Sequence, residues 1–262
     1  MLDTQSPFAD TPTTDAVGLT ERKLRGAILS GGLTAGIRLS EIDLCRDFGQ
    51  GRGIIRAVLA KLAHAGFVVS QPRSGWRVSA ISAAGLREII MARSRLESLL
   101  AEATLSAGEL TSIRTICDMQ AALRSAPLII SWEHRSLHRS YDRQIREILV
   151  AKLKAPLIAD WLGNAWDKSE RYLNYFDRTG AKPAPWFDWR PFIEAKSLGK
   201  DEDAASLLND GCAAFALFAQ ASLLNSDLVA PEAAQRSKAT RLEKAQVQET
   251  TRRREQLPKG TI

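Results

Sequence analysis

Near the start of the chain, apolar residues recur with a helical period in three short stretches. The first begins at Leu19 and ends at the glycine pair 31–32, which is a strong signal for a helix terminus. A second helix is expected after Ser40, a residue type that caps helices, and a third over residues 52–65. The apolar positions of this third helix, at i, i+3, i+4 and i+7, are Ile55, Val58, Leu59 and Leu62.

A hairpin is expected directly after the third helix. Residues 67–70 and 76–79 read as two short strands, and the Gln-Pro-Arg-Ser-Gly between them has the composition of a turn. Another short extended piece, residues 37–39, precedes the second helix. The order helix, helix, turn, helix and hairpin is that of a winged helix-turn-helix, which we therefore predict over residues 17–80.

From Ser82 onward the pattern is helical, with Ala, Leu, Arg and Glu dominant and no strand-like alternation. The expected helices span residues 82–107, 109–125, 130–150, 153–177, 187–199 and 201–225. The predicted fold class is mainly α, an N-terminal winged helix-turn-helix followed by a C-terminal all-α helical bundle over residues 81–225. A disordered N-terminus, 1–16, and a basic flexible tail, 226–262, are expected to flank these domains.

The positive charge of the chain is concentrated in the predicted winged domain. The net charge is +6, and residues 17–80 contain ten Lys or Arg against four Asp or Glu. Residues 81–225 contain eighteen of each sign and are neutral. A basic domain of this kind favours a polyanionic partner, so nucleic acid is the first candidate.

Several other classes of protein are disfavoured by the sequence. Cys45, Cys117 and Cys212 lie far apart and form neither a CxxC pair nor a zinc-binding spacing. No apolar signal segment is visible at the N-terminus, and the longest apolar run, 213–224, is shorter than the ~20 residues of a membrane span. Phosphate-binding loops and nucleophile motifs are not recognisable. We therefore expect a cytoplasmic protein that is neither membrane-bound nor an enzyme.

The glycines, apolar positions and arginines of the N-terminal domain resemble the winged helix-turn-helix of the GntR family. The resemblance runs from Leu24 to Val78 in register, through the segment Thr-Ala-Gly36-Ile-Arg38-Leu-Ser-Glu41 and the hairpin turn Pro72-Arg73-Ser-Gly75. It implies that the third helix lies in the major groove of double-stranded operator DNA.

The resemblance also implies roles for individual residues. Arg52 and Arg56 are one turn apart and project from the same side of the third helix, where an arginine fork can grip guanine. Arg38 is expected to hold a phosphate, and Arg73 and Gly75 to enter the minor groove. The expected DNA-binding residues are thus Arg38, Arg52, Arg56, Arg73 and Gly75.

Three positions depart from the family pattern. This chain has Gly51, Gly53 and Ala57 where the family usually has Ser, Pro and Glu. A glycine cap and a second glycine in the first turn weaken the start of the third helix, which we expect to fray without DNA. A degenerate paralogue, or a helical scaffold that uses the winged helix for protein contacts, remains the alternative.

The helical region resembles the FCD ligand-binding domain of the FadR-type branch of this family. The resemblance rests on helix order, on Arg93-Ser-Arg-Leu-Glu97 and on His134-Arg-Ser-Leu-His138. Such domains often hold a divalent metal through one Asp and three His. Here His134 replaces the Asp, and Trp189 and Gly211 fall near the later histidines. We therefore expect no metal or other cofactor, with His134 and His138 only as weak metal candidates.

In place of a metal, arginines are expected to hold a small organic anion, such as a carboxylate, by bidentate hydrogen bonds. The candidate effector-binding residues are Arg93, His134, His138, Arg139, Arg143, Trp189 and Arg190. The prediction as a whole is a homodimeric, ligand-responsive transcription regulator, a repressor, that binds paired DNA half-sites.

Overall fold

The computed structural model describes residues 14–71, 75–125, 131–180 and 183–226. The chain divides between Ala80 and Ile81 into two compact units. We call them the N-terminal unit and the helical unit (residues 81–226), and describe each by itself.

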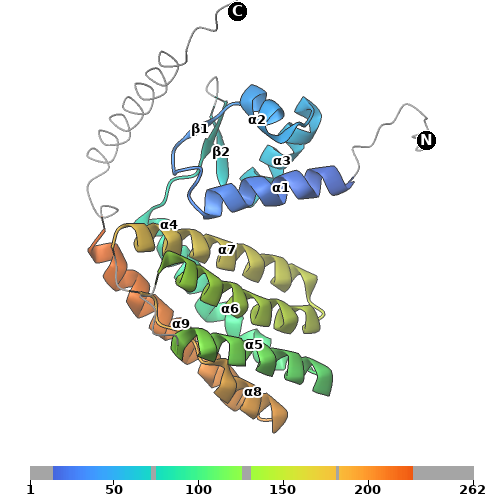
Figure 1. Cartoon of the computed structure of the whole chain (residues 1–262), viewed down its shortest axis with the longest axis vertical. Coiled ribbons are helices and arrows are strands. Elements are labelled where there is room, and N and C mark those ends of the chain that lie inside the picture. Colours follow the sequence, from blue (N-terminus) through green and yellow to red (C-terminus); the bar gives the residue numbers. More distant parts are fainter. Residues whose placement is uncertain (1–13, 72–74, 126–130, 181–182, 227–262) are drawn as a thin grey trace, which may run out of the picture. The chain divides into compact units, whose positions relative to one another are not determined.

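The N-terminal unit combines helices with a small sheet (Figure 1). Its elements are α1 (Thr14–Leu29), β1 (Arg38–Leu39), α2 (Glu41–Phe48), α3 (Arg52–His64), β2 (Val68–Gln71) and β3 (Gly75–Val78). The strands are antiparallel in the order β1-β3-β2, so the predicted hairpin gains a third strand. In the register, Arg38 lies opposite Arg77 and Val68 opposite Val78.

Local sequence explains where the short helices of this unit begin and end. The Ser40 hydroxyl caps α2 by accepting the backbone N–H of Asp43 at 3.3 Å. Gly49, in the left-handed region at φ 62°, ends α2. In contrast, α3 begins after Gly51 with no side-chain cap. The predicted stripe of α3 is fully buried, together with Leu24 and Ile28 of α1.

The start of α1 differs from the prediction. The polar composition of residues 1–16 predicts disorder, but the helix begins at Thr14. Val17 in its first turns is buried in the core of the unit, and this packing extends the helix into the predicted disordered segment. Residues 1–13 and the predicted tail after Ser226 lie outside the described residues.

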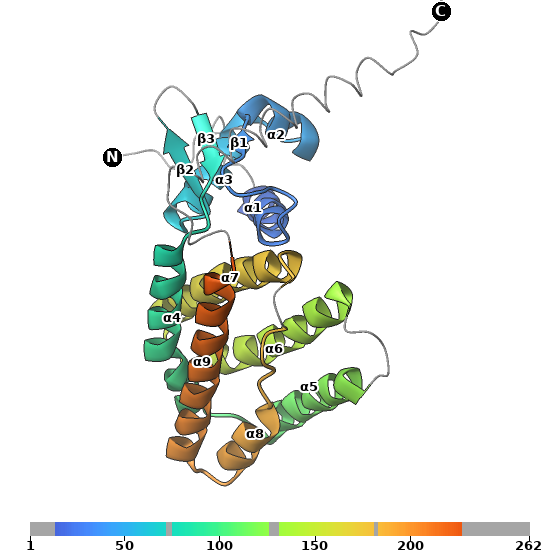
Figure 2. The ribbon, with the colours of Figure 1, turned by 90° about the vertical axis from the view of Figure 1, so that its left-hand side faces the viewer.

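The helical unit is built of helices throughout its described residues. They are α4 (Ala83–Leu96), the 3-10 helix η1 (Glu97–Glu102), α5 (Ala107–Ser125), α6 (Trp132–Lys152), α7 (Pro156–Arg178), α8 (Trp189–Ser197) and α9 (Asp201–Leu224). Helices α4 and α9 run side by side, and α5, α6 and α7 stack across them (Figure 2). The mainly α fold class is thereby confirmed, although the predicted helix 82–107 ends at Leu96 and continues as η1.

The core of the helical unit lies among η1, α5–α9 and their aromatic side chains. Trp189 and Phe192 of α8 are fully buried, with Ile145 and Leu149 of α6 beside them. Helix α9 is long and apolar enough to pass a length-and-composition test for a membrane span. Core helices pass the same test, and α9 packs here against η1, α4 and α8.

Candidate functional site

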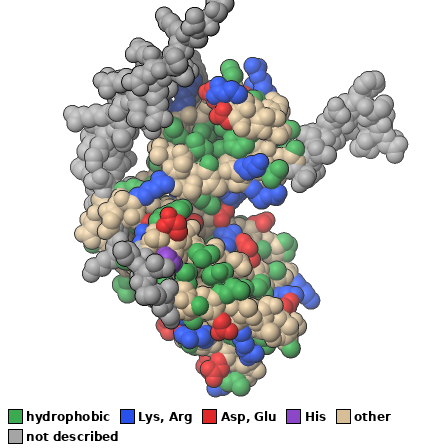
Figure 3. Space-filling model, viewed as in Figure 1, with side chains coloured by type: hydrophobic (Ala, Val, Ile, Leu, Met, Phe, Trp, Pro, Cys, Tyr) green, Lys and Arg blue, Asp and Glu red, His purple; other side chains and the backbone are tan. Residues whose placement is uncertain are grey.

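The predicted DNA-contacting side chains of the N-terminal unit are exposed. Arg52 and Arg56 both project into solvent from α3, and Arg38 does so from β1. Gly75 opens β3 in the left-handed region at φ 77°, a conformation that favours glycine. Arg73 lies outside the described residues. Basic side chains are more prominent than acidic ones on the face of this unit shown in Figure 3, whereas both signs mix on the helical unit.

A polar contact that the sequence analysis did not predict joins α2, α3 and β3 of the N-terminal unit. Glu41, the first residue of α2, accepts the Nε–H of Arg56 at 2.8 Å on one oxygen and the indole N–H of Trp76 at 3.3 Å on the other. The hydrogen bond from Arg56 holds the pKa of Glu41 below its usual value. The partners are 15 and 35 residues away from Glu41, so no local pattern signals the contact.

The helical unit contains a cavity of about 80 Å³ lined by polar and aromatic side chains. Three of the seven predicted effector residues line it, Arg93, His138 and Arg139. The lining charged groups that the prediction missed are Glu97, Arg135, Asp142 and Arg146. The α7–α8 loop contributes residues 184–187, with the rings of Trp186 and Phe187. Arg146 follows Arg139 by two helical turns, a spacing that could have drawn attention to it.

The other four predicted effector residues do not line this cavity. His134 lies near the start of α6, with its Nδ1 3.2 Å from the Ser131 hydroxyl. Arg143 pairs with Glu147 and Asp167, and the exposed Arg190 pairs with Asp188. Trp189 is a core residue that donates its indole N–H to Asp142 at 2.6 Å. Each has a structural partner that directs it elsewhere.

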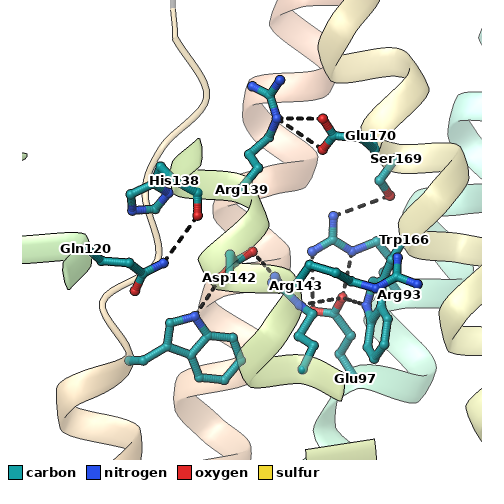
Figure 4. A network of polar contacts seen from close by, with 12 residues as sticks. Arg93, Glu97, Gln120, His138, Arg139, Asp142, Arg143, Trp166, Ser169 and Glu170 are labelled. Atoms are coloured by element: carbon teal, nitrogen blue, oxygen red, sulfur yellow. Dashed lines mark hydrogen bonds and ion pairs between the residues drawn. The ribbon is translucent and has the colours of Figure 1, made fainter. Parts of the chain in front are cut away.

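A buried carboxylate, Glu97, organises one side of the cavity (Figure 4). It accepts hydrogen bonds from the Arg93 Nε at 2.8 Å and the Trp166 indole N–H at 2.6 Å. The Cys212 thiol donates to its second oxygen at 3.1 Å. Burial alone would raise the pKa of Glu97, but the charges of Arg93 and Arg146 lower it to about 2. Glu97 is therefore ionised at neutral pH and fixes both arginines.

Arg139 is held on the other side of the cavity. Its guanidinium donates to Glu170 at 2.9 Å, to Asp177 at 3.0 Å and to the side-chain oxygen of Asn174 at 2.8 Å. Arg135 also pairs with Asp177. The lining arginines are thus balanced by carboxylates, and any ligand would be recognised through hydrogen-bond donors rather than through excess charge.

Two buried nitrogen atoms of the cavity lack a hydrogen-bond partner within the described part of the chain, the Nε2 of His138 and the Nε of Arg146, and the latter lies 3.6 Å from a carboxylate oxygen of Glu97. His138 is 4% exposed, and its ring stacks on Trp186 with 4.2 Å between the centroids. Burial, reinforced by the charges of Arg124, Arg139 and Arg146, lowers the pKa of His138 to about 4. Its imidazole is therefore neutral at pH 7, with a ring nitrogen available to a ligand.

The residues present do not fit a divalent metal. Within the described residues, no three His, Cys, Asp or Glu side chains gather as a metal would require. His138 lines the cavity, but His134 does not. At position 211, where a ligating side chain would be needed, an ideal Cβ would lie 2.6 Å from the Phe187 ring. Phe187 fills the space that a third ligand would occupy.

Comparison with known protein families gives a match within the N-terminal unit. Residues 19–78 match the family model described as bacterial regulatory proteins, gntR family. Residues 19–78 are therefore a DNA-binding domain of the gntR type. The match covers the winged helix from α1 to β3, as the sequence predicts. No curated protein matches the chain.

Solved structures share the fold over most of the chain. Escherichia coli McbR/YncC is 18% identical, with a TM-score of 0.61 over 78% of this chain and 97% of that protein. A GntR protein from Rhodococcus sp. RHA1 is 17% identical, with a TM-score of 0.59 over 79% of this chain and 99% of its own. At these identities the likeness extends to the fold, and both proteins are related to this chain in architecture.

Proposed function

We propose that this protein is a sequence-specific transcription regulator, a homodimeric repressor of the FadR-type branch whose FCD-like helical unit binds a small organic anion without a metal. The observation that carries the proposal is the exposed pair Arg52 and Arg56 on α3 of a gntR-type domain. The activity belongs in the cytoplasm, where operator DNA is found.

The geometry of α3 supports direct reading of base edges. Its apolar stripe is buried, which fixes the rotation of the helix and turns Arg52 and Arg56 outward. Two arginines one turn apart reach neighbouring base pairs in a major groove, and each fork matches the two acceptors of guanine. Arg38 on β1 serves as a phosphate contact.

Selection from a duplex library with a random centre tests this proposal with the full chain. The wild type should enrich a defined sequence, and at least one of Arg52→Ala and Arg56→Ala should flatten preference at one position by about 1–3 kcal/mol. Arg95→Ala, an exposed arginine of α4, is the matched control and should change nothing. If both α3 variants bind the selected site like the wild type, base reading by this helix is wrong.

The cavity of the helical unit supports the effector part of the proposal. The Nε2 of His138 has no hydrogen-bond partner within the described residues and belongs to a cavity that Arg146 also lines, and both residues are more than nine-tenths buried. At about 80 Å³, the cavity can accommodate a small ligand. Because four arginines line this small cavity, we propose a short carboxylate as effector, such as formate or acetate.

Thermal unfolding with formate, acetate and longer organic acids tests the effector. Short carboxylates should raise the unfolding temperature equally with and without EDTA, and Arg146→Lys should weaken the effect while leaving the fold intact. Stabilisation that requires added zinc, nickel or manganese would overturn the metal-free site.

Exposed apolar side chains support a dimer through the helical unit. Met91 of α4 is 62% exposed and Leu217 of α9 is 69% exposed, on two helices that run side by side. Sedimentation of the full chain at tens of micromolar should show a dimer, and Leu217→Glu should shift it toward monomer. A wild-type monomer would contradict this part of the proposal.

A further inference from the structure

The carboxylate of Glu41 is shared between two elements of the winged domain. One oxygen accepts the Nε–H of Arg56 on α3 at 2.8 Å, and the other accepts the indole N–H of Trp76 on β3 at 3.3 Å. The Glu41 side chain is 26% exposed and that of Arg56 is 66% exposed. Glu41 and Trp76 are thus the less exposed partners of the contact, and Arg56 is the more exposed one.

This contact leaves the two terminal nitrogens of the Arg56 guanidinium available for DNA. A guanidinium has five N–H donors, and the pair of terminal nitrogens forms the fork that matches guanine. Glu41 takes the Nε–H, and the terminal nitrogens of Arg56 have no other hydrogen-bond partner within the described residues. The carboxylate thus restrains the side chain without occupying its fork.

The start of α3 offers little restraint of its own. Gly51 provides no side-chain cap, and Gly53 follows in the first turn with no atom within 4 Å of an added Cβ. The Arg56 side chain is 66% exposed, so without a partner it would sample many rotamers, and fixing it on binding would cost side-chain entropy. A fixed carboxylate that is itself anchored by Trp76 reduces that cost.

We propose that Glu41 is a positioning residue for DNA sequence recognition, which holds the fork of Arg56 in its base-reading orientation and is itself braced by Trp76 of the wing. The inference rests on the proposed function, because it concerns how Arg56 reads DNA. According to this proposal, Glu41 and Trp76 contribute to the preference for a DNA sequence without needing to touch a base.

Selection from the same random duplex library measures base preference for Glu41→Ala, Trp76→Phe, Arg56→Ala and the double variant Glu41→Ala/Arg56→Ala. Arg56→Ala should remove the preference for one base at one position of the site. At that same position, Glu41→Ala should lower the discrimination between bases by about fivefold. Trp76→Phe keeps an aromatic side chain and leaves the Glu41 carboxylate in place but removes the indole N–H, so it should cause a smaller loss at that position. In the Arg56→Ala background, Glu41→Ala should have no further effect on base preference.

The outcomes separate this inference from the proposed function. A wild type that enriches no sequence overturns both. A wild type that selects a site, with Glu41→Ala binding all sequences more tightly at unchanged preference, shows that Glu41 acts only as a nearby negative charge. An equal effect of Glu41→Ala with and without Arg56 also overturns the inference. Circular dichroism checks folding, and if Glu41→Ala does not fold, unchanged base preference of Trp76→Phe decides against it.

Discussion

The arginines of the two units occupy opposite environments. In the N-terminal unit Arg38, Arg52 and Arg56 are exposed, and within the described residues only Arg56 of these three has a carboxylate partner. In the helical unit Arg93 and Arg146 are buried against Glu97, whose pKa is lowered to about 2. Arginine side chains are therefore exposed to solvent in one unit and part of a fixed framework in the other.

This difference in burial determines whether substituting an arginine is expected to change the stability of the fold. Removing an exposed arginine should leave the fold intact, because no buried charge loses its partner. Removing one member of the buried cluster leaves its partners uncompensated, so stability changes first. The predictions below test this division, beginning with the largest expected effect.

Glu97→Gln should destabilise the helical unit by about 3–5 kcal/mol, the usual cost of breaking a buried ion pair. The substitution leaves Arg93 and Arg146 buried beside a neutral amide. Urea unfolding followed by far-UV circular dichroism measures it, with Glu102→Gln at the exposed end of η1 as the control. Equal unfolding midpoints of the two variants would show that the buried cluster is not held by Glu97.

The neutral state of His138 should make stability depend on pH. Because the folded pKa is about 4 and the usual value is 6.5, the unfolded chain binds a proton over this interval that the folded chain does not. Stability should fall by roughly 2–3 kcal/mol as the pH drops from 6.5 to 4. His138→Gln should flatten this dependence, whereas His64→Gln, at an exposed position, should preserve it. Parallel curves for wild type and His138→Gln would contradict the assignment.

Gly211→Ala should destabilise the helical unit by about 1–3 kcal/mol through overpacking, since the new methyl group would meet Phe187 at 2.6 Å. Gly163→Ala is the matched control in α7, where the nearest atom is 3.9 Å away. This control should gain about 0.5–1 kcal/mol from the better helix former. Thermal unfolding compares the two, and a stabilised Gly211→Ala would show that Phe187 moves aside at little cost.

Arg38→Ala should have the smallest effect, confined to DNA affinity. If Arg38 holds a phosphate, the slope of log affinity against log salt should fall by about one for any sequence. Fluorescence anisotropy with a random-sequence duplex at several salt concentrations measures this slope. Arg95→Ala on α4 is the control, and an unchanged slope for Arg38→Ala would remove Arg38 from the interface.

The sequence by itself determined the secondary structure and the type of the N-terminal unit. The stripe Ile55, Val58, Leu59 and Leu62 predicted α3, and all four residues are buried in the core. Ser40 predicted the start of α2, and its hydroxyl does cap that helix. These features depend on neighbours a few residues apart, where backbone geometry fixes which side chains share a face.

Only the tertiary structure decided which polar residues meet. Glu41, Arg56 and Trp76 are far apart in the sequence and converge because α2 packs against α3, while β3 pairs with β2, which itself contacts α3. Likewise, Arg143 and Arg190 pair with carboxylates outside the cavity, whereas Arg146, which the pattern did not single out, lines it. A buried charge takes its partner from whichever helix lies opposite, and one sequence carries no record of that partner.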